Sequence, residues 1–366
     1  MSAPNLGLAT TPERMRATRI DRFGGPDVIE FDRQPVPRPG PAEALLQVAY
    51  CGICRHDLLT RQGAFPRSLL PVTLGHQISG RIVELGSTVT SFVVGDRVMT
   101  MPLVGCGSCA SCDTENDAHC LTDNPKFLGE DYDGGYAEYV VVPERALVAV
   151  PADVPLATAS ILTCTFGTAY HAVVTRGELR PGELVVVTGA SGGIGSHVVR
   201  LASALGATVV GVVSSAQNAE VALAAGASDV IVDPDRRFAE ELRTRHGRRA
   251  DLVCDVVGAP TLRESLRSVR TGGRVVVVGN VLGTEATIPP AYLILKEISL
   301  LGTKSCTRQE MLAVLELVRA GTISASDVDI HPFSEIPALH QQMEREGISG
   351  RAVVAIAGAE LAGAGF

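Results

Sequence analysis

Short apolar runs rich in β-branched residues alternate with segments of helical length through the second half of the chain. The apolar runs are ELVVVTGA, ATVVGVVS, DVIVD, DLVCDVVG and RVVVVGN. Strands buried on both faces of a parallel sheet have this composition, and the segments between them end at glycine, as helices do. The alternation therefore predicts an α/β unit with a doubly wound parallel sheet.

The chain before about residue 151 has a different pattern, because short, partly alternating runs are separated by clusters of glycine and proline. This pattern predicts an all-β body of many short strands. A further helix, RQEMLAVLELVRAG, and a strand, GRAVVAIA, follow the α/β alternation. We expect one domain made of residues 1–165 and 305–366 and a second made of residues 166–304.

Composition narrows the classes of partner. The 366 residues carry a net charge of −8, so we expect no basic face for a nucleic acid or an anionic membrane. No apolar stretch approaches the roughly 18 residues of a membrane helix, and the N-terminus lacks the apolar core of a signal peptide. We therefore expect a cytoplasmic protein that acts on a small molecule, with its nine cysteines serving as metal ligands or core thiols.

The stretch VVVTGASGGIGSHVVRLASALGA places a glycine-rich turn directly after a buried strand and before a helix. A glycine-rich loop alone would indicate only a tight turn, but this context is the one that a dinucleotide site requires. Small residues let the backbone approach a pyrophosphate, and the helix N-terminus supplies N–H donors. The predicted contacts are Gly189, Ser191, Gly192, Gly193, Ile194 and Gly195.

The end of the second strand of this series decides between NAD and NADP. An NAD site usually places a carboxylate there for the ribose 2′-hydroxyl. Here Ser214 and Ser215 follow Val213, so no acid repels a 2′-phosphate and two hydroxyls can donate to it. No basic residue follows at once, but the two serines favour NADP(H) over NAD(H).

The loop GCGSCASCDTENDAHC carries four cysteines in a C-x2-C-x2-C-x7-C array. Four thiolates in one loop fill a tetrahedral zinc site with no open position, so we expect a structural zinc. Unrelated core cysteines are a poor alternative, because the segment is rich in Gly, Ser and Asp. His119 is expected to be a bystander. The predicted ligands are Cys106, Cys109, Cys112 and Cys120.

A second set of possible ligands is scattered along the chain. Cys54 lies in ICRHD, His76 in TLGHQISG and Cys164 in ILTCTFGTAYH. Two thiolates and one imidazole leave a fourth position for water or substrate, as catalytic zinc sites do. Spacing alone leaves the alternative open that Cys164 is a core thiol and His76 a buried, hydrogen-bonded histidine.

Together these motifs resemble the zinc-containing medium-chain dehydrogenase/reductase family, typified by alcohol dehydrogenases. The likeness spans about Met15 to Ile356 and rests on CGICRHDLL, LGHQISGRIVELG, the four-cysteine loop, DGGYAEYVVVP, GASGGIG and GRAVV in this order. The resemblance implies a GroES-like all-β catalytic domain and a Rossmann cofactor domain. It also implies two zinc ions per chain, with Cys54, His76 and Cys164 as ligands of the catalytic one.

The same resemblance assigns further roles near the metal and the cofactor. Asp57 matches the carboxylate that orients the ligand histidine. Arg55 and Arg351 match positions near the cofactor pyrophosphate. Cys51 falls outside the ligand set.

The chain also departs from the family pattern. His56 stands where most members have the Ser or Thr that relays the substrate proton, and it either takes over this relay or is turned away. Gln77 replaces a glutamate beside the metal, which removes a negative charge near zinc. Leu59 occupies the place of a relay histidine found in some members.

The resemblance supports two reactions. In the first, zinc polarises an oxygen while nicotinamide exchanges hydride with its carbon, which interconverts an alcohol with an aldehyde or ketone. In the second, suggested by a likeness of CRHDLLTRQGAFPR and GAPTLRESLRS to acryloyl-CoA reductase relatives, NADPH reduces an activated C=C bond. The retained ligand residues favour the first reaction. A nucleotide sensor without turnover is a third, non-enzymatic reading.

The expected pocket is apolar and of modest size. The family resemblance implies that an edge strand in the apolar run from Arg274 to Leu301 lies against a second subunit, so we expect a homodimer or homotetramer. The residues expected to line the pocket are His56, Phe65, Leu103, Phe127, Tyr170 and the neighbourhood of Val281.

Overall fold

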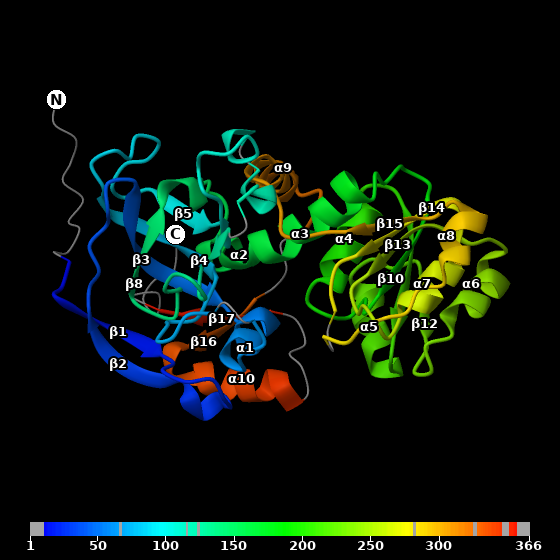
Figure 1. The fold of residues 1–366 in the computed structure, drawn as a ribbon, viewed down its shortest axis with the longest axis horizontal. Helices are drawn as coiled ribbons and strands as arrows, with labels where there is room; N and C mark the ends of the chain where they lie inside the picture. The colour runs from blue at the N-terminus through cyan, green and yellow to red at the C-terminus, as the bar shows by residue number, and fades with distance from the viewer. Residues whose placement is uncertain are drawn as a thin grey trace. The chain divides into compact units, whose positions relative to one another are not determined.

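The computed structural model shows two compact units, which Figure 1 draws as a ribbon. The first unit comprises Met1–Thr163 and Ser326–Phe366, and the second comprises Cys164–Ala325. The expectation that residues 305–325 belong to the catalytic domain stays a prediction. The structure describes residues 11–65, 68–114, 116–122, 125–280, 283–324, 328–345 and 351–356.

A seven-stranded sheet forms the centre of the described part of the first unit. Its longest strand, β3 (Glu43–Gly52), pairs antiparallel with β4, β8 and β17. Two smaller pairs, β1 with β2 and β6 with β7, complete the β body that the sequence predicts. The other strands are β1 (Arg14–Arg19), β2 (Glu30–Pro35), β4 (Gln77–Leu85), β5 (Arg97–Thr100), β6 (Leu103–Val104), β7 (Lys126–Phe127), β8 (Tyr139–Pro143), β9 (Leu147–Ala149), β16 (Asp329–Pro332) and β17 (Ala352–Ala355).

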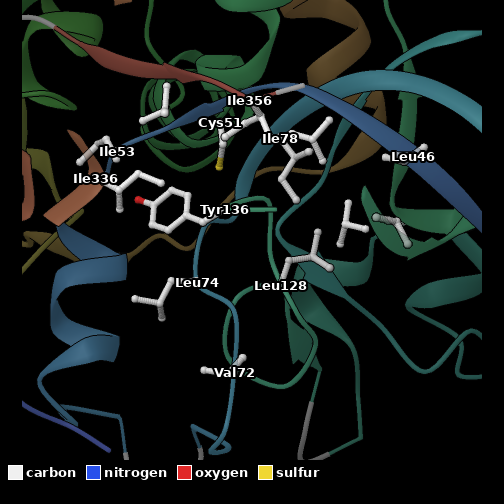
Figure 2. Close-up of a cluster of buried hydrophobic side chains, with 14 of the residues drawn as sticks. Leu46, Cys51, Ile53, Val72, Leu74, Ile78, Leu128, Tyr136, Ile336 and Ile356 are labelled. Atoms are coloured by element: carbon white, nitrogen blue, oxygen red, sulfur yellow. The ribbon is translucent and has the colours of Figure 1, made fainter. Parts of the chain in front are cut away.

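Three α-helices pack on this body: α1 (Arg55–Arg61), α2 (Leu156–Leu162) and α10 (Ile336–Arg345). Helix α10 was not predicted from the sequence, although its buried residues recur at helical spacing. Figure 2 shows part of the core of this unit, where the ring of Tyr136 lies among Cys51, Leu74, Ile78 and other apolar side chains. Short 3₁₀ turns occupy Pro26–Val28, Cys112–Thr114, Asp117–His119, Glu144–Ala146 and Phe333–Glu335.

The second unit is the predicted doubly wound sheet. Its strands are all parallel and lie in the order β12-β11-β10-β13-β14-β15, which is the strand order of a Rossmann fold. The strands are β10 (Leu184–Thr188), β11 (Thr208–Val213), β12 (Asp229–Val232), β13 (Ala250–Asp255), β14 (Val269–Val277) and β15 (Ser299–Gly302). The helices are α3 (Thr168–Tyr170), α4 (Gly195–Ala204), α5 (Ala216–Ala224), α6 (Phe238–His246), α7 (Leu262–Ser268), α8 (Pro290–Lys296) and α9 (Arg308–Arg319).

One expected boundary is wrong. The alternation predicts that TLRESLRSVRTGG, one of the segments between the apolar runs, is helical up to its glycines, but α7 ends at Ser268 and strand β14 begins at Val269. The Lys296 ammonium lies 3.2 Å from three carbonyl oxygens at this helix end, and carbonyls left free at a helix C-terminus favour such a cation. This tertiary contact is invisible in the local sequence.

No helix in the described part of the chain is both long enough and apolar enough to cross a membrane.

Candidate functional site

The four cysteines of the loop converge. The Sγ atoms of Cys106, Cys109, Cys112 and Cys120 all lie within 4.8 Å of one another. The Cys106–Cys112 and Cys109–Cys120 sulfur pairs are 4.0 Å apart, close to the roughly 3.8 Å that a tetrahedron with 2.3 Å zinc–sulfur bonds requires. The donor set and its spacing therefore fit a structural zinc ion.

Hydrogen bonds within the loop prepare some of these thiols as ligands. Contacts with Ser108 lower the pKa of Cys106 to about 6, whereas burial raises the pKa of Cys112 to about 12. A salt bridge from Arg145 to both carboxylate oxygens of Asp117, at 2.6 and 2.7 Å, ties the loop to the β body. His119 is hydrogen-bonded to Asn116 and does not belong to the cysteine cluster.

A second convergence joins Cys54, His76 and Cys164, whose ligand atoms also lie within 4.8 Å of one another. The Nε2 atom of His76 is buried and has no hydrogen-bond partner among the described residues. An imidazole nitrogen buried in this way beside two thiols is costly unless another group binds it. The three side chains therefore fit a metal ion with one coordination position left open.

Local backbone features position these three residues. Cys54 precedes α1 as its N-cap, and His76 stands directly before β4. Gly75 adopts a φ of +100°, and a side chain there would collide with Tyr136 and Cys51. Cys164 lies in a π-helical turn, Thr163–Gly167, that interrupts the helix after α2. Such turns are frequent at functional sites, because they change the direction in which a side chain projects.

Asp57 holds the other nitrogen of His76. Its Oδ1 atom accepts hydrogen bonds from Nδ1 of His76 at 2.8 Å and from the backbone N–H of Gly75 at 3.2 Å. Burial opposes a charge on His76, but Asp57 outweighs it and raises the pKa of His76 to about 10. Because Nδ1 carries the shared hydrogen, Nε2 is the atom that faces the thiols and can bind a metal.

His56 lies beside this cluster. Its ring stacks between those of Phe65 and Phe127, with centroids 4.6 and 4.3 Å away, and its centroid is 5.2 Å from that of His76. Its Nε2 atom makes a short hydrogen bond to Glu130.

Glu130 is a partner that sequence reasoning missed. It lies 74 residues after His56 in an irregular loop, and no spacing signal connects the two. Its Oε1 atom also accepts a hydrogen bond from the Thr60 hydroxyl at 3.1 Å. An imidazole, a carboxylate and a hydroxyl thus form a connected set next to the candidate ligand His76.

The other residues expected to line the pocket are spread over both units. Leu103 pairs with Phe127 between β6 and β7. Tyr170 belongs to α3 of the second unit. Val281 lies outside the described residues.

The glycine-rich turn connects β10 to α4 in the second unit, as predicted. Gly189 has a φ of +60°, and a side chain on Gly195 would come within 2.1 Å of the carbonyl oxygen of Gly189. Ser191, Gly192, Gly193 and Ile194 complete the turn before the helix begins. Only small residues allow this close approach, which leaves backbone N–H groups available to an anion.

A buried carboxylate organises the strand ends beside this turn. Asp255, at the end of β13, accepts hydrogen bonds from the hydroxyls of Thr188, Thr261 and Ser265 at 2.6 to 2.8 Å. It also accepts from two backbone N–H groups of the following loop. Because Thr188 ends β10, Asp255 fixes the carboxyl ends of two neighbouring strands, where doubly wound sheets bind their ligands.

The remaining predicted residues have contrasting environments. Ser214 and Ser215 are exposed after β11, and Arg55 is exposed at the start of α1. Arg351 is buried, and its Nε and Nη2 atoms have no hydrogen-bond partner in the described structure. Gln77 is equally buried, with neither amide atom paired to a described residue.

Comparison with known proteins matches both units. Residues 40–152 match the alcohol dehydrogenase GroES-like domain, and residues 193–320 match the zinc-binding dehydrogenase family. An acryloyl-coenzyme A reductase of Sulfurisphaera tokodaii is 36% identical over 82% of this chain and 90% of its own length. The chain belongs to the zinc-containing medium-chain dehydrogenase/reductase family.

Other members of this family are similarly related. An NAD-dependent alcohol dehydrogenase of Sulfolobus acidocaldarius is 33% identical over 93% of this chain and 100% of its own length. The crystal structure of a protein named AibC superposes with a TM-score of 0.88 at 38% identity, covering 94% of this chain and 96% of that one. Membership makes this chain an NAD(P)-dependent oxidoreductase, and it confirms the GroES-like and Rossmann folds that the sequence predicts.

Proposed function

We propose that this oxidoreductase interconverts an alcohol with an aldehyde or ketone at a zinc ion held by Cys54, His76 and Cys164. The observation that carries the proposal is the convergence of these three ligand atoms around the buried, unpartnered Nε2 of His76. A zinc ion bound there would supply Lewis acidity to the substrate oxygen, and a bound nicotinamide would exchange hydride with the substrate carbon.

The protein's own side chains orient the ligands and move the proton. Asp57 holds the hydrogen on Nδ1 of His76 and keeps Nε2 directed at the metal position. In alcohol oxidation His56 accepts the substrate hydroxyl proton at one ring nitrogen and releases the hydrogen on Nε2 to Glu130. Thr60 stabilises the Glu130 carboxylate by its hydrogen bond. Replacement of His56 by Ala should then flatten the pH dependence of turnover, and an unchanged profile would exclude the relay.

We further propose NADP(H) as the preferred cofactor. Ser214 and Ser215 place exposed hydroxyls, and no carboxylate, directly after β11. The unpaired guanidinium atoms of Arg351 and the exposed Arg55 are suited to the pyrophosphate. Turnover should show a lower KM for NADPH than for NADH, and Ser214→Asp should reverse this order by repelling the 2′-phosphate. A wild-type preference for NADH would contradict the assignment.

Reduction of an enoyl thioester is the second candidate, favoured by the 36% identity to an acryloyl-coenzyme A reductase. The two reactions are separated by assaying aldehydes, ketones and enoyl-CoA thioesters with wild type, Cys54→Ser and Cys51→Ser. If the proposal holds, Cys54→Ser loses carbonyl turnover by at least about 100-fold. Cys51→Ser is the matched control, because Cys51 is a buried thiol three residues away and outside the ligand cluster. Enoyl turnover that survives Cys54→Ser, without any carbonyl turnover, would establish the second candidate.

We also propose that β15 pairs with a second copy of this chain. β15 is the edge strand of its sheet, and the neighbouring helix α8 exposes Ile294 and Leu295 to 72% and 79%. Unpaired strand edges and exposed apolar side chains favour association. A homodimer or homotetramer and a cytoplasmic location both stay predictions.

A further inference from the structure

Two helices of the first unit face one another with charged and polar side chains. Asp57 and Arg61 lie one turn apart on α1, and His340 and Glu344 lie one turn apart on α10. Asp57, Arg61 and His340 are all at most 2% exposed. Arg61 forms a salt bridge with Glu344, which also accepts a hydrogen bond from Gln62 at 2.6 Å. We call Asp57, Arg61, His340 and Glu344 the seam between the two helices. Burying charged and polar groups in this way is costly unless they are well connected by hydrogen bonds and ion pairs.

Tyr136 connects the two helices at the inner end of the seam. Its hydroxyl lies 3.2 Å from Nε2 of His340, and the two rings meet edge to face at 5.8 Å. In Figure 2 the ring stands inside the apolar cluster, and its hydroxyl oxygen points toward Ile336 and Ile53 rather than toward Leu128. Burial raises the pKa of Tyr136 well above its usual value, and the charge of Asp57 and hydrogen bonding to it raise this pKa further. Tyr136 therefore stays protonated between Asp57 and His340.

The unsatisfied atoms along the seam indicate the direction of its hydrogen bonds. Oδ2 of Asp57 is a buried acceptor, and Nε and Nη1 of Arg61 are buried donors. None of these three atoms has a hydrogen-bond partner in the described structure. Nδ1 of His340 is likewise buried without one. Burial and Arg61 keep His340 neutral by lowering its pKa to about 4, against the charges of Asp57 and Glu344. With its hydrogen on Nε2, His340 can donate to the Tyr136 oxygen at 3.2 Å, which leaves the Tyr136 hydrogen free to be directed at Asp57.

We infer that Tyr136 and His340 are positioning residues that hold the Asp57 carboxylate, and through it the His76 imidazole, in the orientation a bound metal requires. Oδ1 of Asp57 already binds His76, so the rotation of the carboxylate depends on what its Oδ2 faces. We assign this position to the Tyr136 hydroxyl, which His340 contacts from α10, more than 200 residues further along the chain. Helix α10 thereby becomes part of the metal site without touching a ligand.

The inference rests on the proposed catalytic metal, and the test has its control inside the same molecule. Zinc-loaded protein is challenged with a chromogenic chelator, and metal release is followed over time. The four-cysteine loop shares no residue with the seam, so its release phase is the internal standard. In Tyr136→Phe, metal release from the Cys54 site should accelerate about tenfold, at the lower end of the 10–100-fold range for partners of metal ligands. Metal release from the four-cysteine loop should stay unchanged.

Further variants separate positioning from general stability. His340→Gln keeps a polar group near the position of Nε2 and should release metal almost as slowly as wild type, whereas His340→Leu should behave like Tyr136→Phe. Gln341→Ala, on the exposed face of α10, is the matched control. Cobalt substitution adds a readout independent of activity, because the d–d spectrum of the Cys54 site should change in Tyr136→Phe and stay unchanged in Gln341→Ala.

Each outcome decides the matter. Unchanged release and an unchanged cobalt spectrum in Tyr136→Phe and His340→Leu would overturn the inference. Equal acceleration of both phases would also overturn it, because loss of general stability acts on both sites. If wild type binds only one zinc per chain, the proposed catalytic metal falls and the inference falls with it. If wild type binds two and the variants have no effect, the inference alone fails.

Discussion

The Nδ1 atom of His76 lies 2.8 Å from Oδ1 of Asp57, and both side chains are almost completely buried. No regular secondary structure pairs these two residues, since Asp57 belongs to α1 and His76 precedes β4. The contact keeps a hydrogen on Nδ1, and therefore makes Nε2 the nitrogen at which a metal ion would displace a proton.

Replacement of Asp57 by Asn tests this relationship. The amide can still accept a hydrogen bond but carries no charge, so zinc affinity at the Cys54 site should fall by about 10–100-fold. Titration of metal-free protein with zinc, in competition with a dye, measures the change. Asp32→Asn on exposed strand β2 is the control and should leave both affinities as in wild type. Equal affinities for Asp57→Asn and wild type would show that Asp57 does not orient the ligand.

The four-cysteine loop should contribute to stability. Its segment contains little regular structure, and in the described structure its cysteines form no disulfide that would replace a zinc ion. Cys112→Ser should therefore bind one zinc fewer and melt roughly 5 °C lower, since each 1 kcal/mol shifts Tm by about 2–4 °C in a unit of this size. His119→Ala, in the same loop, should keep its zinc and its Tm. Calorimetry and metal analysis of the two variants give the answer, and full zinc content in Cys112→Ser would contradict the assignment.

The buried His340 should make stability fall in mild acid. Its pKa is lowered to about 4, so between about pH 6.5 and pH 4 the unfolded chain takes up a proton that the folded chain does not. The folded state should therefore lose about 2 kcal/mol between pH 7.5 and pH 5 through this one group.

Urea unfolding at the two pH values measures the difference. His340→Gln should lack this part of the loss, while His331→Gln, at a partly exposed histidine bound to Glu335, should show the wild-type loss. An identical loss in wild type and His340→Gln would mean that His340 is protonated in both states.

The edge of the second unit's sheet gives a prediction about assembly. Leu295→Glu places a charge on the exposed apolar surface of α8, next to the unpaired edge of β15, and should shift the protein from dimer to monomer. Light scattering during gel filtration measures the mass directly. Leu223→Glu is the matched control, because Leu223 is an exposed leucine on α5 of the same unit. A mass that is the same for Leu295→Glu and wild type would place any interface elsewhere.

Local chemistry explains which parts of the molecule the sequence predicts. The turn at Gly189 and the four-cysteine loop are each determined by a few neighbouring residues, so their spacing alone indicates a phosphate-binding turn and a metal loop. The strand order of the second unit also follows, because buried β-branched runs and crossover helices leave few arrangements.

Relationships between distant segments are harder to predict. Glu130 contacts His56 across 74 residues of sequence, and an irregular loop offers no periodicity that would point to its partner. Helix α10 was missed although Ile336, Leu339, His340 and Met343 have helical spacing, because a histidine at a core position weakens the apolar pattern. The place of His340 becomes clear only when Tyr136 is seen beside it.

The two cysteine-containing clusters differ in how far apart their members stand in the chain. The loop cluster spans Cys106 to Cys120, whereas Cys54 and Cys164 are separated by 110 residues. During synthesis the loop can capture its metal as soon as those few residues leave the ribosome, because no distant contact is needed to gather its thiols. The other cluster has to wait until a segment more than 100 residues downstream has been translated and folded back. If both clusters bind zinc as proposed, they fill at two separate times during synthesis, and a cell short of zinc would accumulate chains with a filled loop and an unfilled second cluster.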